Sequence, residues 1–110
     1  MNALKSLSFV VVASLCAPAA LGSDAPQGLS LKDHVFSPSV IHVRANEPTV
    51  ISLTNQDNTA EEFDSTALKV EKVVASGSTG SIRLRPLAPG RYPFMGEYHS
   101  ETAQGVVIAE

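Results

Sequence analysis

The chain has one cysteine, Cys16, and no tryptophan among its 110 residues. A disulfide needs two cysteines, so no bridge within the chain stabilises it, and an apolar core has to do so instead. Cys16 also lies in an N-terminal apolar stretch that we expect to be removed. The remaining chain then has no thiolate, which excludes cysteine-dependent catalysis and a thiolate-bound metal.

The N-terminal stretch has the pattern of a secretory signal peptide. Lys5 provides a positive charge, and the apolar run SLSFVVVASLCAPA follows it. Ala20 and Gly22 place small residues three positions and one position before a cleavage site. We therefore expect residues 1–22 to be a signal peptide and residues 23–110 to be a single domain.

Two other interpretations of this start fit less well. A membrane anchor needs about 20 apolar residues, and Ser6, Ser8 and Ser14 interrupt a shorter run. Lipoprotein cleavage at Cys16 favours a small residue before the cysteine, whereas Leu15 is large. The sequence predicts export to the periplasm and release, without stable membrane insertion.

The charge balance is acidic. The full chain has a net charge of −3, and removing Lys5 with the signal peptide leaves 7 basic against 11 acidic residues, a net charge of −4. Such a balance argues against nucleic acid and anionic membrane surfaces as partners, and it is compatible with the attraction of cations.

Short apolar runs separated by Pro, Gly and Asn fill the rest of the chain, and no stretch has the pattern of a long amphipathic helix. About seven such strands predict an all-β fold, either an antiparallel β-sandwich or a Greek-key barrel. The clearest runs are residues 40–43, 50–53, 70–74, 82–84, 92–98 and 106–109.

From about residue 29 onward the chain resembles a cupredoxin-like domain. The segments that carry the resemblance are HVFSPSVIHVRANEPTVISLTNQD and LAPGRYPFMGEYHSETAQGVVIAE. The shorter motifs KDHVFSP, EEFDS and GEYH followed by TAQG are similar to the small periplasmic cupredoxin-like proteins of iron-permease uptake systems and to the Efe-type iron-uptake domain. The resemblance implies a Greek-key β-sandwich and an accessory role in metal uptake.

The ligand loop departs from a blue copper centre, which uses two histidines, a thiolate and a weak axial methionine. By the resemblance, the upstream histidine falls at Glu61 or Glu62, and Gly96 stands at the cysteine. Residues 102–104 contain no methionine, and His99 alone matches a ligand position. We therefore expect a metal site of another type.

The candidate ligands are carboxylates and imidazoles, which suit iron, Cu(II), Zn or Mn. In an extended strand Glu62 and Asp64 project to one side while Phe63 packs inward. The same alternation would put Glu97 and His99 on one side of their strand. The predicted metal ligands are Glu62, Asp64, Glu97 and His99, supported by His34 and Glu61.

Each of these residues also has a simpler interpretation. Glu61 and Glu62 can be solvated carboxylates, Asp64 can cap a turn, and His34 can lie on the surface. His42 alternates with apolar neighbours and is expected to face solvent. Tyr92, Phe94 and Tyr98 are expected to pack in the core and at the barrel end.

The predicted function is that of a periplasmic metal-binding protein that assists iron or copper uptake by cation capture and delivery. A membrane iron permease or a periplasmic iron-binding protein is the expected recipient. Enzyme motifs are missing from the sequence, and the resemblance leaves open only oxidation of ferrous iron by a bound copper or iron. The alternative is a metal-free β-sandwich that docks a protein partner through an acidic rim.

Overall fold

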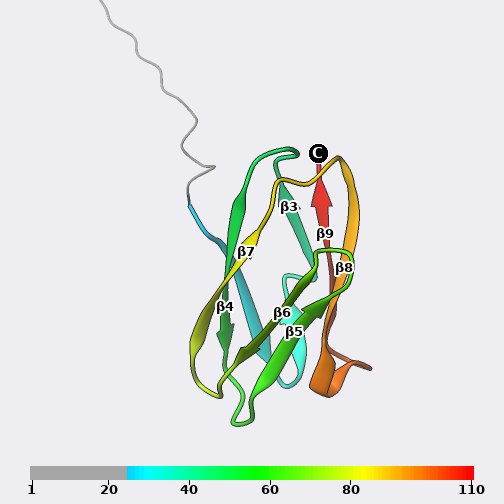
Figure 1. Cartoon of the computed structure of the whole chain (residues 1–110). Coiled ribbons are helices and arrows are strands. Elements are labelled where there is room, and N and C mark those ends of the chain that lie inside the picture. Colours follow the sequence, from blue (N-terminus) through cyan, green and yellow to red (C-terminus); the bar gives the residue numbers. More distant parts are fainter. Residues whose placement is uncertain (1–24) are drawn as a thin grey trace, which may run out of the picture.

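The computed structural model describes residues 25–110, and the predicted signal peptide lies outside them. Within this range, nine strands and one short 3₁₀ helix form a β-sandwich (Figure 1), which confirms the predicted all-β fold. The elements are β1 (Gln27–Lys32), β2 (Val35–Ser37), β3 (Val40–Val43), β4 (Thr49–Asn55), β5 (Glu61–Ser65), β6 (Val70–Val74), β7 (Thr79–Leu84), β8 (Gly90–Gly96), η2 (Glu97–His99) and β9 (Gln104–Ala109).

The strands form two sheets, with the order β2-β1-β4-β7 in one and β3-β9-β8-β5-β6 in the other. The pairs β1–β4 and β3–β9 are parallel, and the other neighbours are antiparallel. The strand pattern alone indicates an antiparallel sandwich, whereas the observed sheets combine parallel and antiparallel pairs. The chain passes from the first sheet to the second between β2 and β3, at the cis peptide bond between Ser37 and Pro38.

The core lies between the sheets and follows the two-residue alternation of the strands. Along β5, Glu61, Phe63 and Ser65 point inward, while Glu62 and Asp64 are only half-buried. Phe63 stacks on Phe94, with ring centroids 4.8 Å apart, and Phe36 meets both rings edge-on. The predicted inward packing of Phe63 is confirmed, and the aromatic group fixes β5 and β8 beneath the rim of the sandwich.

A two-residue turn, Asp33–His34, connects β1 to β2 and makes the two strands a hairpin. Both residues have positive φ, 52° and 60°, as a type I′ hairpin turn requires. Asp and His tolerate this conformation better than most residues do. The turn accounts for part of the difference between the nine observed strands and the seven or so predicted.

Strand β8 ends at Gly96, and η2 follows it. The prediction of a strand through residue 98 is therefore wrong. A 3₁₀ helix has three residues per turn, so Glu97 and His99 do not project to one side as they would in a strand. Tyr98 is 52% exposed, which corrects its predicted packing in the core, whereas Phe94 is buried as expected.

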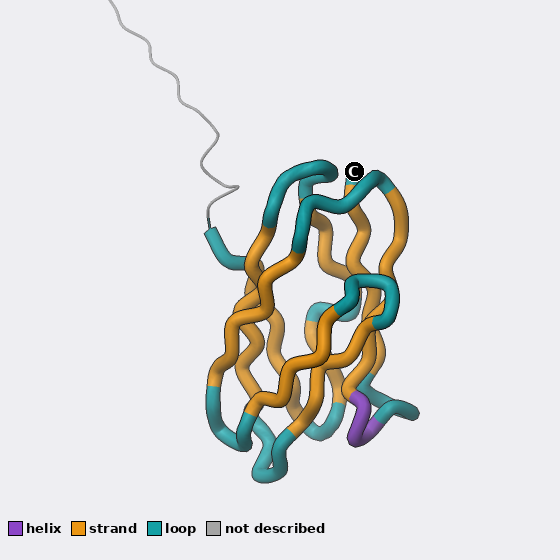
Figure 2. Tube along the Cα trace, in the orientation of Figure 1, coloured by secondary structure: helices purple, strands orange, loops and turns teal. Residues whose placement is uncertain are grey.

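Figure 2 shows η2, in purple, at the same end of the sandwich as the β1–β2 turn and the β4–β5 loop. Within residues 25–110, none of the helical structure is long and apolar enough to span a membrane.

Candidate metal centre

Three potential metal ligands meet at this end of the sandwich. His34 comes from the β1–β2 turn, Glu61 begins β5, and His99 ends η2. One ligand atom from each residue lies within 4.8 Å of the others. The site therefore joins residues from both sheets, and it contains three of the six predicted ligands.

Glu61 is a fully buried carboxylate with protein donors on both oxygens. Its Oε1 accepts hydrogen bonds from the backbone N–H of Glu62, at 3.0 Å, and of Tyr98, at 2.8 Å. Its Oε2 lies 2.7 Å from Nδ1 of His99. Hydrogen bonds to a charged acceptor compensate the loss of solvation that burial causes.

Gly96 makes room for this carboxylate. A Cβ atom at position 96 would lie 2.7 Å from Cδ of Glu61 and 2.8 Å from its Oε2. It would also lie 2.8 Å from Cβ of Ala103. The Glu61 carboxylate therefore lies against the position at which the resemblance had placed a cysteine, so any side chain there would collide with it.

The His34 ring stacks on the His99 ring, with centroids 3.5 Å apart and planes inclined by 12°. Thr102 anchors the turn that carries His34, because its Oγ1 donates a hydrogen bond to the His34 carbonyl oxygen at 2.6 Å. Among residues 25–110, Nδ1 of His34 is the one buried side-chain nitrogen or oxygen of a non-exposed residue without a hydrogen-bond partner.

Asp57 holds the same turn from the β4–β5 loop. It accepts hydrogen bonds from the backbone N–H of Asp33, at 2.6 Å, and of His34, at 3.0 Å. Its Oδ2 also lies 3.4 Å from Nδ1 of His34. Burial raises the pKa of Asp57. The two backbone donors and the nearby His34 and His99 rings lower this pKa by a larger amount, so the net shift is downward.

Asp57 is not among the predicted site residues. The sequence signal is the polar run Asn55-Gln56-Asp57-Asn58 between two strands, which on its own indicates only a turn. Short polar side chains in such loops often accept backbone hydrogen bonds. Nothing in the local pattern, however, indicates that the receiving backbone belongs to a turn 23 residues away.

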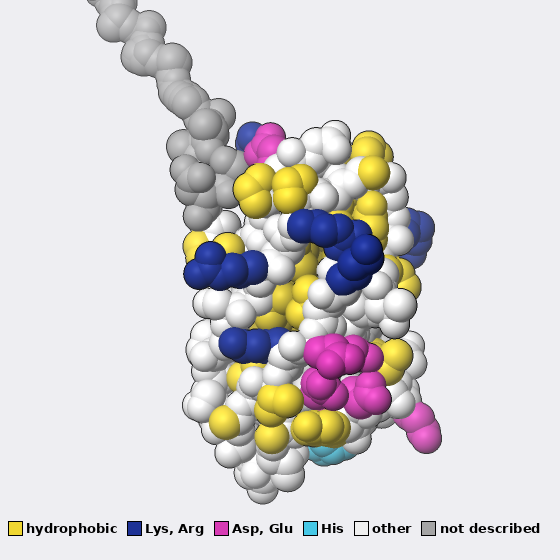
Figure 3. All heavy atoms as spheres, in the orientation of Figure 1, with side chains coloured by type: hydrophobic (Ala, Val, Ile, Leu, Met, Phe, Trp, Pro, Cys, Tyr) yellow, Lys and Arg dark blue, Asp and Glu magenta, His cyan; other side chains and the backbone are white. Residues whose placement is uncertain are grey.

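The other three predicted ligands lie elsewhere. Glu62 and Asp64 are on the outer face of β5, and Glu97 of η2 is electrostatically linked to them. Hydrogen bonding to Asp64 and the negative charge of Asp64 raise the pKa of Glu97, with smaller contributions from burial, Glu62 and Glu71. Figure 3 shows acidic side chains gathered on one face. The structure thus divides the predicted ligands into two groups. His34, Glu61 and His99 form a rim cluster, and Glu62, Asp64 and Glu97 belong, together with Glu71, to an outer acidic group.

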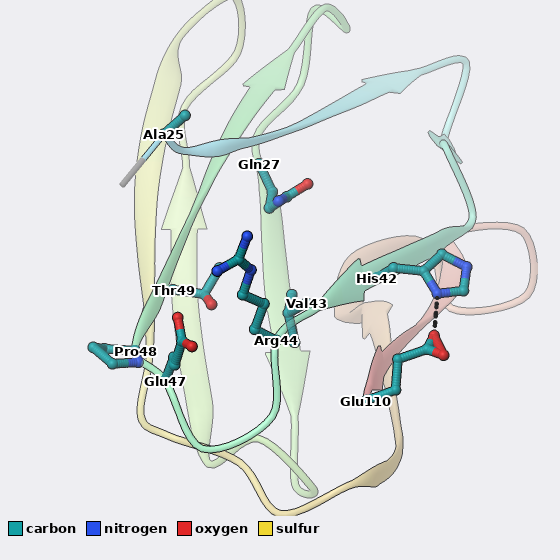
Figure 4. Close-up of a pocket in the computed structure, with 9 residues that line it drawn as sticks. All are labelled: Ala25, Gln27, His42, Val43, Arg44, Glu47, Pro48, Thr49 and Glu110. Carbon is teal, nitrogen blue, oxygen red and sulfur yellow. Dashed lines mark hydrogen bonds and ion pairs between the residues drawn. The ribbon is translucent and has the colours of Figure 1, made fainter. Parts of the chain in front are cut away.

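His42 faces solvent, as expected, and lies 2.8 Å from a carboxylate oxygen of Glu110. Both residues line a hollow of about 480 Å³ between the ends of β3 and β4 (Figure 4). Arg44 and Glu47 line it as well, so it contains charges of both signs. His34, Glu61 and His99 do not line this hollow.

Residues 5–109 match the model of the cupredoxin-like domain family, and the chain belongs to this family. Over 80 residues it is 39% identical to an uncharacterized protein of Rickettsia prowazekii (strain Madrid E). This match covers 73% of the chain, and the chain spans 64% of the length of that relative.

Solved structures with a similar fold include copper proteins. The metal-binding domain of the Cu(I)-exporting P-type ATPase CopA from Streptococcus pneumoniae D39, with Cu(I), has a TM-score of 0.64 at 15% identity, covering 76% of this chain and 82% of that one. The reduced Cu(I) form of an amicyanin variant has a TM-score of 0.62 at 12% identity, covering 83% and 88%. Reduced auracyanin from Roseiflexus castenholzii has a TM-score of 0.63 at 12% identity, covering 81% and 99%. At these identities the likeness establishes the fold.

Proposed function

We propose that this chain is an exported metal-binding protein that assists iron or copper uptake and that His34, Glu61 and His99 form its metal centre. The observation that carries the proposal is the convergence of two imidazoles and a buried carboxylate within 4.8 Å. The similar folds solved with Cu(I) are consistent with a metal-binding role for this chain.

The donor set favours particular metals. Imidazole suits copper, zinc and iron, and carboxylate suits harder ions. With no thiolate among the three residues, Cu(II), Fe(II) and Zn(II) fit better than Cu(I), and an intense blue colour is not expected. The Glu61 carboxylate lowers the electrostatic cost of placing a cation beside His99, because it is 2.7 Å from that ring.

Delivery to a partner completes the proposed role. The predicted signal peptide supports a periplasmic location, and the resemblance to iron-permease accessory proteins supports a membrane permease or a periplasmic iron-binding protein as recipient. Copper or iron, when bound, would supply one-electron exchange, so oxidation of ferrous iron is compatible with the site. The outer acidic group, Glu62, Asp64, Glu71 and Glu97, adds negative potential near the centre, which attracts cations.

The test is a calorimetric titration of protein purified after expression of the full chain, with Cu(II), Zn(II), Mn(II) and, without oxygen, Fe(II). We expect saturable binding of one ion per chain with no intense thiolate-to-copper absorption band. His99→Ala should weaken binding at least about tenfold, since loss of even an indirect metal partner has that effect. His42→Ala, at the distant hollow, should leave the affinity unchanged.

A second candidate function is protein docking through the outer acidic group, which is favoured by its exposure on one face. Charged patches of this kind mainly accelerate association. The absence of binding for all four ions, or equal effects of His99→Ala and His42→Ala, would overturn the proposed metal centre and favour docking.

A further inference from the structure

Both imidazoles of the rim cluster direct Nδ1 toward a carboxylate. We infer that Asp57 and Glu61 are positioning residues that hold the proton on Nδ1 of His34 and His99, so that the two Nε2 atoms form the metal-binding pair. This inference rests on the proposed metal-binding function and deepens it: within the three-residue centre, the two imidazoles bind the ion and Glu61 orients His99 instead of binding the ion itself.

The His99 side of the pair is the more direct. A carboxylate can only accept hydrogen bonds, so the 2.7 Å contact makes Nδ1 of His99 the donor to Oε2 of Glu61. The Glu61 side chain is 1% exposed, and its other oxygen already accepts two backbone N–H groups. Glu61 is thus enclosed by protein donors and suited to orienting His99 rather than to holding an exchangeable ion.

The contact between His34 and Asp57 is longer and is not a hydrogen bond in this structure, but it has the same electrostatic sense. Nδ1 of His34 is buried and lies 3.4 Å from Oδ2 of Asp57. A lone pair on this nitrogen would face a negative oxygen and be repelled, whereas an N–H would be attracted. Asp57 is itself fixed by the backbone N–H groups of Asp33 and His34, and its own N–H donates to Oδ1 of Asn55 at 2.9 Å.

The Nε2 atoms differ from the Nδ1 atoms in their surroundings. Neither the His34 nor the His99 Nε2 has a hydrogen bond to the described residues, and neither is among their buried, unpartnered atoms. The two side chains are 39% and 29% exposed, and the stacking keeps the rings in contact. Each Nε2 is therefore accessible and belongs to a ring that a carboxylate orients through Nδ1, a recurrent arrangement around protein-bound metals.

This division of roles has a consequence for delivery. Zinc in proteins takes about four ligands, and this arrangement supplies two from the chain. Water or donors from a recipient protein would supply the rest, so the ion can be passed on without removing a buried ligand. The two rings are stacked and nearly parallel, so binding of one ion by both Nε2 atoms would require the rings to tilt toward a common point.

The test measures the tautomers of the metal-free protein by proton–nitrogen NMR correlation of the imidazole rings, at mildly alkaline pH where imidazole is neutral. We expect the proton on Nδ1 in both His34 and His99. In Asp57→Asn the His34 ring should populate the Nε2–H form while His99 stays unchanged, and affinity for Cu(II) or Zn(II) should fall about 10–100-fold.

Glu110→Gln is the matched control, because it also removes one carboxylate charge beside an imidazole, that of His42, but at the hollow that His34 and His99 do not line. It should alter neither tautomer. An Nε2–H form of His34 in the unmutated protein would overturn the inference without any variant, as would equal affinities and tautomers for Asp57→Asn and Glu110→Gln. Absence of metal binding by the unmutated protein, by contrast, would refute the proposed function. The tautomers are measured on the metal-free protein, so they test the inference whether or not metal binds.

Discussion

At the scale of single residues, Glu61 and Gly96 depend on one another. A buried carboxylate is costly unless every part of it is accommodated, and the missing side chain at position 96 provides the space. The backbone at Gly96 has a φ of −93°, which any residue can adopt. The requirement for glycine at this position is therefore steric and comes from the site itself.

We expect Gly96→Ala to lower the free energy of unfolding by about 1–3 kcal/mol, because overpacking at a tight position has that cost. The added methyl group would press on Glu61 and displace the carboxylate from His99. Denaturant titration monitored by circular dichroism measures the change. Gly28→Ala is the control, since a Cβ at position 28 meets nothing within 4 Å. Equal stability of the two variants would contradict the steric account.

At the scale of elements, the β1–β2 turn and η2 determine where the imidazoles lie. The two-residue turn places His34 on the rim, and the change from strand to 3₁₀ helix after Gly96 turns His99 inward toward Glu61. Thr102 then joins the two elements through its hydrogen bond to His34. The site depends on these local geometries more than on the strands that flank them.

His34 has two roles, its positive φ in the turn and its imidazole in the metal centre, and two substitutions separate them. His34→Asn should retain most of the stability, because Asn adopts positive φ readily, while weakening metal binding at least about tenfold. His34→Ala should weaken binding equally and also cost about 1 kcal/mol or more through the left-handed conformation. Thermal unfolding together with metal titration separates the two effects. A less stable Asn variant than Ala variant would contradict the assigned turn.

At the scale of the whole molecule, metal binding should raise thermal stability. A ligand at 100 times its dissociation constant stabilises the folded state by about 2.7 kcal/mol. For a domain of this size that corresponds to a rise in Tm of roughly 10–20 °C. Differential scanning fluorimetry with and without Zn(II), followed by a chelator, should show the rise and its reversal. His34→Asn should show neither, and an equal rise in that variant would place the ion elsewhere.

The fold was predictable from the sequence because strand alternation and the ligand-loop motifs can both be recognised within short stretches of sequence. Phe63 and Phe94 lie in the core as their alternation indicates. The short strand β2 and the end of β8 were not predicted, since a two-residue turn and a 3₁₀ helix leave little trace in hydrophobic periodicity.

The candidate site was predictable in part. His34, Glu61 and His99 were among the six residues named, but Glu62 and Asp64 could not be separated from Glu61 without knowing which face of β5 is covered. The sequence pattern also could not reveal Asp57, because its partner is a turn distant along the chain. Contacts between different elements determine both which carboxylate of β5 belongs to the site and which turn Asp57 holds, and such contacts are not visible in a local sequence pattern.

The position of the rim cluster across both sheets gives a bound ion a further effect. His34 belongs to the hairpin of the first sheet, whereas His99 follows a strand of the second. An ion held by both rings would close a loop of more than 60 residues, as a disulfide does, and such cross-links restrict the unfolded chain more strongly as the loop lengthens. Metal would then serve this chain as a reversible staple, and each delivery of the ion would also loosen the end of the sandwich that meets the recipient.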